Sequence, residues 1–283
     1  MKLFDDISII RAEILHEQGQ YMKLWLQEGR HGTMHYMERE RSDLRVVMPT
    51  VRSAVVTLTS YNRGQQSQPP GAPPIARYAW GADYHPIIRG RLHQLLAQIQ
   101  LRYPQGHGRA IVDTAPALEK AWAARANLGF IGRNSLLVSP TLGSFTHIGM
   151  LLTDLEYEQL ETIFSPKEPL KVSCGTCRRC LEGCPTGAIL PSGGLDARQC
   201  LAYLTIESRE PYHGQAFYGC DRCQSSCPYN RAAPRGELLE VNQELVAMTL
   251  KQWRELSPEL FEARFGTTPL KRVGLERLRS FLE

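Results

Sequence analysis

All eight cysteines of the chain lie between Cys174 and Cys227, and none occurs in the first 173 residues. The first four follow a C-x2-C-x2-C-x3-C-P pattern, which bacterial ferredoxins use to hold iron–sulfur clusters. Short spacing lets three thiolates grip one cluster, while the proline turns the fourth sulfur toward a neighbouring cluster. These residues are Cys174, Cys177, Cys180 and Cys184, followed by Pro185.

The second group of cysteines is less regular, because Cys200 stands twenty residues before Cys220. It comprises Cys200, Cys220, Cys223 and Cys227, followed by Pro228. Crossed ligation predicts one [4Fe–4S] cluster on Cys174, Cys177, Cys180 and Cys227, and another on Cys184, Cys200, Cys220 and Cys223. A zinc site on Cys174, Cys177, Cys220 and Cys223 is the alternative, but it leaves the other four cysteines without a role.

The composition is that of an ordinary globular protein, with 42% hydrophobic and 22% charged residues among 283. The opening segment MKLFDDISIIRAEIL fits neither a secretory signal nor a twin-arginine leader, and no run of about 18 apolar residues occurs. We therefore expect a cytoplasmic protein with no membrane partner, and a monomer by default. In a reducing compartment, clustered thiols favour metal ligation over disulfides.

Strand and helix signals alternate before residue 160. The segments 52–61 and 108–116 are typical of strands, while 87–103 and 117–129 carry apolar residues at helical spacing. We expect the second helix to stop at Gly129, residues 157–173 to form a linker, and residues from about 236 onward to be helical. The pattern predicts a layered α/β domain in front of the cysteines. A bare ferredoxin needs only about 60 residues, so this domain is expected to house a substrate or a second cofactor.

Several segments together resemble the epoxyqueuosine reductase family, in collinear order over nearly the whole chain. They are HGTMHYMERERSDLRVVMPTVRSAV, RYAWGADYH, VDTAPALEKAWAARANLGFIGRNSLLVSPTLGSFTHIGMLLTD, LDARQCLAYLTIE and YGCDRCQSSCPYNR. The resemblance implies an α+β fold in which a nitroreductase-like α/β cobalamin-binding domain (1–165) joins a ferredoxin-like domain with two [4Fe–4S] clusters (166–235). A C-terminal helical segment (236–283) follows.

The resemblance also implies an activity, namely reduction of the epoxide of epoxyqueuosine in tRNA to queuosine, the last step of queuosine biosynthesis. An external low-potential electron donor would feed the two clusters, and cob(I)alamin would attack the epoxide of a flipped-out wobble nucleoside. Two other functions stay open: another cobalamin/iron–sulfur reductase, such as a dehalogenase, and a non-catalytic electron-transfer or cobalamin-handling protein. A flavin is the alternative occupant of a nitroreductase-like pocket.

The family's catalytic acid falls on Asp113 in the VDTAP motif. We expect apolar surroundings to raise the pKa of this carboxyl group, so that it keeps a proton for the epoxide oxygen. A turn or helix cap is the alternative role. The family's cobalamin contacts fall on Arg41, Arg77, Asp113, Leu137, Ile148, Leu151, Ala202, Asp221 and Arg222. Core packing is the alternative for the three apolar residues between 137 and 151.

Two further segments lead to predictions about His85 and about the basic residues near the end of the sequence. Asp83-x-His85 is close to the D-x-H-x-x-G element of proteins that bind cobalamin through histidine, but the glycine comes one residue late. We therefore expect His85 at a helix start near the pocket and not as a cobalt ligand. The family's usual helical-repeat extension does not follow, so we expect four basic residues to contact tRNA phosphates, with a solvated helix face as the alternative. They are Lys271, Arg272, Arg277 and Arg279.

Overall fold

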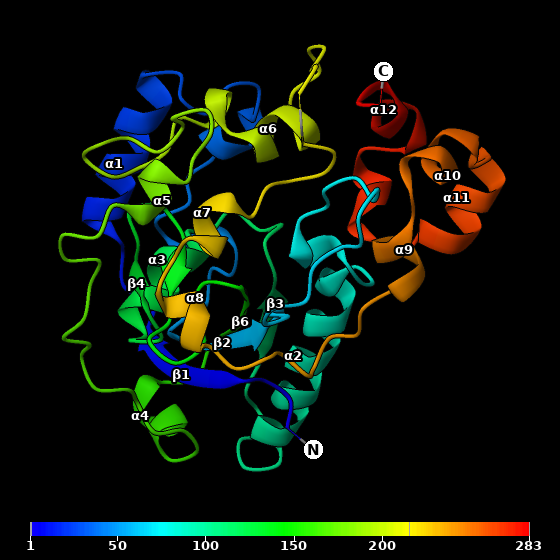
Figure 1. Ribbon diagram of the computed structural model, residues 1–283. Coiled ribbons are helices and arrows are strands. Elements are labelled where there is room, and N and C mark those ends of the chain that lie inside the picture. Colours follow the sequence, from blue (N-terminus) through cyan, green and yellow to red (C-terminus); the bar gives the residue numbers. More distant parts are fainter. Residues whose placement is uncertain (1, 215, 283) are drawn as a thin grey trace.

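The computed structural model describes residues 2–214 and 216–282, and at its centre lies a four-stranded antiparallel sheet (Figure 1). The strands lie in the order β1 (Asp6–Arg11), β2 (Ser53–Ser60), β6 (Thr146–Thr153) and β3 (Gly108–Ile111). β2 is buried at every position and β6 at most positions. Such burial is expected of central strands that are covered on both faces. A small second sheet pairs β4 (Phe130–Ile131) with β5 (Leu137–Val138).

Helices and 3-10 turns make up most of the remaining regular structure. The α-helices are α1 (His16–Gln27), α2 (Tyr84–Gln100), α3 (Glu119–Arg125), α4 (Tyr157–Glu161), α5 (Arg179–Glu182), α6 (Leu201–Ile206), α7 (Arg222–Ser225), α8 (Tyr229–Ala232), α9 (Gln243–Ala247), α10 (Leu250–Glu255), α11 (Pro258–Phe265) and α12 (Leu275–Ser280). The 3-10 turns are η1 (His35–Glu38), η2 (Leu44–Val46), η3 (Arg77–Ala79), η4 (Ala197–Gln199) and η5 (Pro269–Arg272).

Successive residues of β6 contribute to two separate cores, because strand side chains alternate between the faces of a sheet. Met150 shares a core with Trp122 of α3. Leu151 shares the opposite core with Ile88 of α2. Gly149 lets α2 come close, since a Cβ at this position would lie 2.7 Å from the Ile88 side chain. The sheet is therefore held between α2 and α3.

The sequence predictions for this region are mostly confirmed. β2 and β3 lie within the expected strands, and α2 and α3 coincide with the expected helices. α3 does not run to Gly129, because Asn127 adopts the left-handed conformation (φ 57°) and the chain has already left the helix. The expected linker is partly wrong, since α4 occupies its first residues and an exposed stretch follows.

The described part of the cysteine-bearing segment (174–214 and 216–227) contains short helices, turns and an isolated bridge between Ile189 and Leu195, and α5 and α7 contact each other within it. The helices predicted after residue 236 are confirmed as α9 to α12, which lie together at one side of the molecule (Figure 1). Their core contains Trp253 and Phe265, and it also takes in Trp80 and Phe217 from earlier in the chain. Within the described ranges, no helix is both long and apolar enough to cross a bilayer.

Candidate functional site

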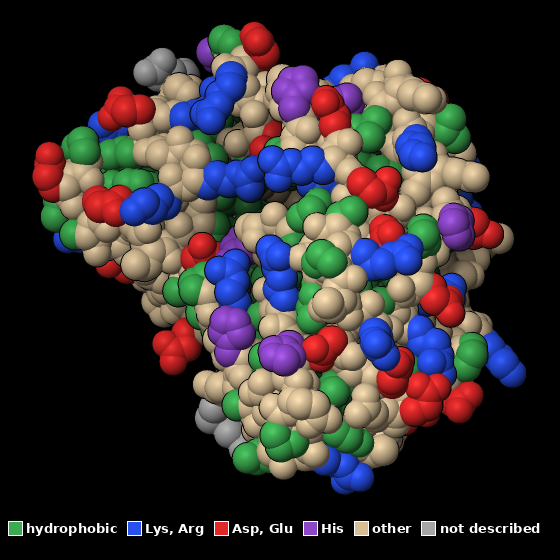
Figure 2. Space-filling view, turned by 180° about the vertical axis from the view of Figure 1, so that it is seen from behind, with side chains coloured by type: hydrophobic (Ala, Val, Ile, Leu, Met, Phe, Trp, Pro, Cys, Tyr) green, Lys and Arg blue, Asp and Glu red, His purple; other side chains and the backbone are tan. Residues whose placement is uncertain are grey.

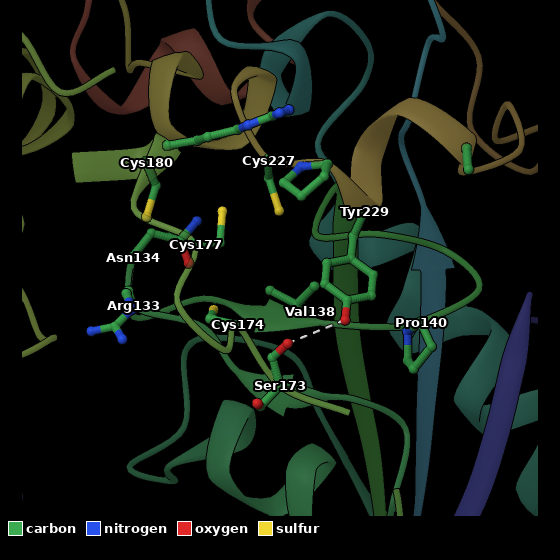
Figure 3. Close-up of a pocket in the computed structure, with 13 residues that line it drawn as sticks. Arg133, Asn134, Val138, Pro140, Ser173, Cys174, Cys177, Cys180, Cys227 and Tyr229 are labelled. Atoms are coloured by element: carbon green, nitrogen blue, oxygen red, sulfur yellow. Dashed lines mark hydrogen bonds between the residues drawn. The ribbon is translucent and has the colours of Figure 1, made fainter. Parts of the chain in front are cut away.

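Four cysteines from distant parts of the segment line one cavity of about 390 Å³. Their sulfur atoms face a common space, which Val138 and Tyr229 help to enclose (Figure 3). The Tyr229 hydroxyl donates to the Ser173 carbonyl at 3.3 Å and so ties the two ends of the segment together. Four thiols around one enclosed space are a donor set that fits an iron–sulfur cluster. The four are Cys174, Cys177, Cys180 and Cys227.

The other four cysteines lie within mutual electrostatic reach. The Cys200 thiol is affected by the charge of Cys184, and both Cys220 and Cys223 are affected by that of Cys200. Burial, with the charges of the neighbouring thiols, raises the pKa of Cys223 to about 12. Cys223 is also affected by Cys180 of the first group. The fold places Cys174, Cys177, Cys180 and Cys227 at one cavity, and the crossed assignment of the other four stays a prediction.

Asp113 lies at the end of β3 in the left-handed conformation, with φ 58°. Asp tolerates this conformation better than most residues. The Asp113 N–H donates to Oε1 of Glu119 at 2.7 Å, and Oδ2 accepts a hydrogen bond of 2.8 Å from the Tyr84 hydroxyl. Its side chain stays 60% exposed. The alternative role as a cap does not apply to α3, which starts after Leu118 without a side-chain cap.

His85 lies in the first turn of α2, as expected, and bridges two carboxylates. Its Nδ1 lies 2.6 Å from Oδ1 of Asp83, and its Nε2 lies 3.6 Å from Oδ2 of Asp113. Asp83 Oδ1 also accepts the His85 backbone N–H at 3.0 Å, which fixes the start of the helix. One imidazole therefore stands between the helix cap and the end of β3.

The expected raised pKa of Asp113 is wrong for this geometry. Desolvation acts to raise it, but the nearby His85 imidazole, 3.6 Å away, and the hydrogen bond from the Tyr84 hydroxyl lower the pKa of Asp113 to about 2. For His85, desolvation acts to lower the pKa, but its contacts with the acceptor carboxylates of Asp113 and Asp83 outweigh desolvation and raise the pKa. The proton of the pair therefore resides on the imidazole.

Tyr84 is stacked between two imidazole rings. Its ring centroid lies 4.1 Å from that of His85 and 3.7 Å from that of His147. Burial lowers the pKa of His147 to about 3, so this ring is neutral near pH 7. Sequence reasoning missed both Tyr84 and His147. The position of Tyr84 beside His85 was an available signal, whereas only the fold brings β6 and His147 to α2.

Known proteins match both the region that contains Asp113 and the cysteine-bearing segment. The family model "Epoxyqueuosine reductase QueG, DUF1730" matches residues 41–114, and "4Fe-4S double cluster binding domain" matches residues 173–230. An epoxyqueuosine reductase of Cellulophaga algicola is 36% identical to this chain, over 99% of the chain and 94% of the relative.

The chain belongs to the epoxyqueuosine reductase family.

Solved epoxyqueuosine reductases have the same fold. The Streptococcus thermophilus structure is 28% identical, with a TM-score of 0.86 over 98% of this chain and 75% of that one. Another epoxyqueuosine reductase, crystallised with a tRNA-Tyr epoxyqueuosine-modified tRNA stem loop, is 25% identical, with a TM-score of 0.85 over 99% of this chain and 76% of that one. The double-cluster match spans all eight cysteines, which confirms an iron–sulfur segment in place of the zinc alternative.

The remaining residues that the family resemblance implied differ in accessibility. The Arg77 N–H donates to Oδ2 of Asp221 at 2.8 Å, so these two distant positions are neighbours. Ile148, Ala202 and Arg222 keep accessible surface. These five residues could contact a ligand without rearrangement of the core.

Three other implied contacts belong to the interior. Leu151 has no accessible surface and lies in the α2-side core, opposite Ile148, so its expected side-chain contact with a cofactor is not supported. Leu137 is 3% exposed and packs in the α3-side core. The buried Arg41 guanidinium donates to the carbonyls of Ala115 (3.2 Å) and Tyr36 (2.7 Å), which braces the loop after Asp113.

The four basic residues near the C-terminus are largely occupied within the protein. Lys271 pairs with Glu262, and Arg272 pairs with Glu207 at 2.6 Å. Arg277 and Arg279 donate to backbone carbonyls of α6 and of the turn after α10. Their expected role in phosphate contact is therefore not supported by these contacts. Arg272 and Arg277 instead join the C-terminal helices to the cysteine-bearing segment, while Lys271 and Arg279 make contacts among the C-terminal helices.

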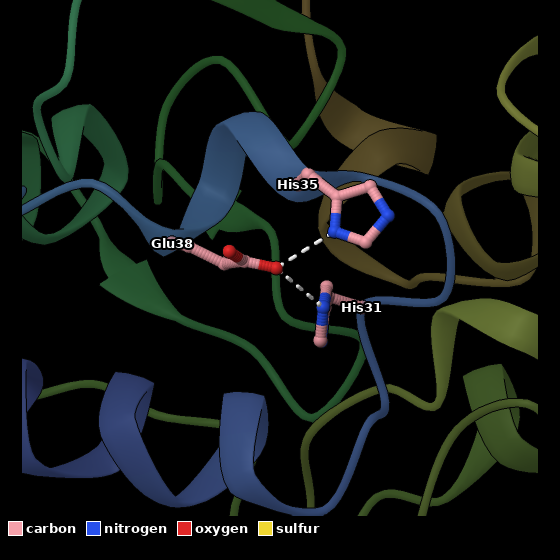
Figure 4. Close-up of side chains that lie close together, drawn as sticks. All are labelled: His31, His35 and Glu38. Carbon is pink, nitrogen blue, oxygen red and sulfur yellow. Dashed lines mark hydrogen bonds and ion pairs between the residues drawn. The ribbon is translucent and has the colours of Figure 1, made fainter.

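A second cluster of titratable groups, which the sequence did not reveal, surrounds η1. Nε2 of His31 and Nδ1 of His35 lie 3.4 Å and 2.8 Å from the same Oε1 of Glu38 (Figure 4). Two imidazoles and a carboxylate are possible metal ligands. Here the imidazoles already share the carboxylate oxygen, and His35 and Glu38 are exposed, so the cluster's evident role is to stabilise η1.

Proposed function

We propose that this chain reduces the epoxide of epoxyqueuosine in tRNA to the alkene of queuosine, the last step of queuosine synthesis. The observation that carries the proposal is the similarity of 99% of the chain to an epoxyqueuosine reductase, combined with an exposed Asp113 carboxylate just after β3. A relative of the same fold binds an epoxyqueuosine-modified tRNA stem loop. The relatives described above are epoxyqueuosine reductases, which favours this reaction over the rival functions, dehalogenation and simple electron transfer.

The cavity supports assignment of one [4Fe–4S] cluster to Cys174, Cys177, Cys180 and Cys227. The second cluster would bind Cys184, Cys200, Cys220 and Cys223. An external low-potential donor would supply single electrons through these clusters. Because Cys180 and Cys223 are within electrostatic reach of each other, the two clusters would be neighbours.

Cobalamin is the second cofactor that we propose. Arg77, Ile148, Ala202, Asp221 and Arg222 combine apolar, cationic and anionic accessible groups, which suit a corrin ring and its amide side chains. Bound cobalamin would supply the low-potential nucleophilic chemistry that no amino-acid side chain offers. Leu137 and Leu151 would support this site from the core.

The chain's own residues would handle the proton. We assign Asp113 as the acid that protonates the epoxide oxygen while the C–O bond breaks. Tyr84 holds Oδ2 of Asp113, and Glu119 holds its backbone N–H. These two contacts fix the direction of the carboxylate.

The molecular surface supports a nucleic-acid substrate. Figure 2 shows a band of Lys and Arg side chains beside a hollow on one face. The formal net charge is +4, and basic bands of this kind attract phosphates. A tRNA substrate would place the enzyme in the cytoplasm. We propose that the enzyme is a monomer with three parts, namely a cobalamin-binding domain (1–165), a ferredoxin-like domain (166–235) and a C-terminal helical segment (236–283).

The test is to load the protein with its cofactors without oxygen, measure its metals, and supply tRNA that carries epoxyqueuosine. We expect about eight irons per chain, together with cobalt and formation of queuosine. D113N should retain the metals and lose epoxide reduction. D154N is the matched control, because Asp154 forms another Asp–His pair, with His107 at 3.1 Å. Fully loaded wild-type protein that leaves the epoxide intact would overturn the proposal.

A further inference from the structure

The reaction needs a proton that Asp113 does not hold. Oδ2 of Asp113 accepts the Tyr84 O–H and faces Nε2 of His85, and these contacts lower the pKa of the carboxyl group, so it is ionised near pH 7. Conversion of an epoxide to an alkene and water consumes two electrons and two protons. The cluster-fed reductant of the proposed function supplies the electrons, so the protons require a separate source.

The Tyr84 hydroxyl donates to Asp113 but keeps its own proton, because its pKa is raised; the next donor to Oδ2 of Asp113 is His85. Its Nε2 lies 3.6 Å from Oδ2 of Asp113, and its other nitrogen is held by Asp83 at 2.6 Å. The carboxylate of Asp83 keeps a proton on Nδ1, so the second proton of the imidazolium is the one on Nε2, which faces Asp113, and loss of that proton leaves the neutral Nδ1–H tautomer. The His85 side chain is 23% exposed and can exchange protons with solvent.

We propose, on the basis of the function proposed above, that His85 and Asp113 form one proton-transfer couple in which His85, held by Asp83, stores the proton that Asp113 delivers to the epoxide oxygen. In each delivery, the His85 Nε2–H bond breaks as an O–H bond forms on Asp113, and that O–H bond breaks as the substrate oxygen is protonated. Neutral His85 then takes a proton from water. A second cycle supplies the proton that leaves with the oxygen as water. His85 acts through Asp113 and is a positioning and proton-storing residue.

The other charged groups around the couple are compatible with this assignment. On β6, the buried His147 is neutral because its pKa is lowered to about 3. On α3, burial and the charge of Asp113 raise the pKa of Glu119, while burial lowers the pKa of Lys120. Tyr84, between the two histidines, has its pKa raised by burial and by Asp113, so it stays a neutral hydroxyl. Glu119 accepts from the backbone N–H of Asp113 and does not touch its carboxylate, so His85 is the imidazole of this cluster that faces Oδ2 and can exchange a proton with it.

The gap of 3.6 Å is too long for direct transfer and must shorten, or be bridged by one water, when substrate enters. Closure of the gap moves a loop residue, Asp113, toward a helix residue, His85. Loop residues are usually the more mobile partner in such a pair.

The first measurement is the titration of His85 in cofactor-loaded, oxidised protein labelled with ¹⁵N-histidine. We expect the pKa of His85 to fall by at least about one unit in D113N, and also in D83N, because each variant removes an opposite charge nearby. H93Q, a change at an exposed histidine of the same helix, should leave the His85 titration unchanged. An unchanged His85 pKa in D113N would overturn the couple.

The second measurement is the pH dependence of single-turnover epoxide reduction. In H85Q, which keeps a polar partner for Asp83, we expect a loss of about 10²-fold at pH 7.5. The rate should also fall tenfold per pH unit between pH 6 and 8. Wild type and H93Q should show a plateau that ends at the His85 pKa. An H85Q profile that matches wild type would overturn the couple.

The two proposals can fail separately. If the wild-type protein is inactive on epoxyqueuosine but its His85 pKa falls in D113N, the couple is supported and the substrate assignment is overturned. If the wild-type protein is active and its His85 pKa does not respond to D113N, the substrate assignment is supported and the couple is overturned.

Discussion

The backbone N–H of Arg77 donates a hydrogen bond of 2.8 Å to Oδ2 of Asp221. This contact joins η3, just before α2, to the turn that carries Cys220 and Cys223. A neighbouring bridge between Ile75 and Tyr218 strengthens the same junction. Two segments that supply different parts of the site are thus connected at one point.

D221A should destabilise this junction, because it leaves the Arg77 N–H without its acceptor. We expect a loss of about 1–3 kcal/mol in the free energy of unfolding. D221N is the matched control, since an amide oxygen can still accept the bond, and it should lose less than half as much. Denaturant titration of both variants checks this, and equal losses would show that the hydrogen bond is not the cause.

G219A tests how closely the same two segments approach. Gly219 has φ +68°, and a Cβ there would lie 2.7 Å from Cβ of Ala76. Gly187 has nearly the same φ, +67°, but no atom within 4 Å of such a Cβ. G187A should therefore cost only the backbone penalty of about 1–2 kcal/mol. G219A should cost about 1–3 kcal/mol more, from overpacking. Indistinguishable thermal unfolding of the two variants would contradict this packing.

The lowered pKa of His147 should make the folded protein less stable in acid. Its pKa is lowered to about 3 in the folded protein and is about 6.5 in the unfolded chain. Between these values the unfolded state binds the proton and the folded state does not, so stability falls as the pH falls, by up to about 1.4 kcal/mol per pH unit.

H147F removes this titration and keeps an aromatic ring between Tyr61 and Tyr84. The substitution breaks no hydrogen bond at Nε2, because Nε2 of His147 has no partner among the described residues. Unfolding free energies at pH 4, 5, 6 and 7 should therefore vary less in H147F than in wild type. H93F, at an exposed site on α2, should keep the wild-type slope. A wild-type slope in H147F would contradict the buried neutral imidazole.

The crossed arrangement of cysteines predicts opposite outcomes for two neighbours in sequence. C180S should resemble C227S, because these residues line the same cavity. C184S should instead resemble C200S. Each variant should retain about four irons per chain, and electron paramagnetic resonance of the reduced proteins reports which cluster remains. Identical spectra for C180S and C184S would rule out the crossed assignment.

Local sequence pattern was sufficient for much of the sheet domain. β2 was predictable from its β-branched residues, and α2 and α3 from their helical periodicity. β6 was not assigned as a strand, although it lies at the centre of the sheet. Its sequence THIGMLLT contains Gly149, and the reason for a glycine at this position is visible only in the fold, where α2 packs against it. Pairing with β2 and β3, which is long-range, defines this strand.

The site was predictable in its covalent chemistry but not in its electrostatics. Cysteine spacing described the two groups, because metal ligation constrains spacing directly. The protonation of Asp113 was misjudged because it depends on His85 and Tyr84, which a different element brings into contact. Leu151 and Ile148 lie on one strand, and only the register of β6 shows that they face different cores.

The C-terminal helices share one apolar core with Trp80 and Phe217. A shortened chain ending near residue 235 would expose both aromatic side chains, which lie close in sequence to Arg77 and to Cys220, and would remove the apolar core that packs against these two segments. No minimal catalytic fragment should therefore be obtainable by trimming this end, and fusion tags there are best attached through a spacer that leaves α12 free to pack.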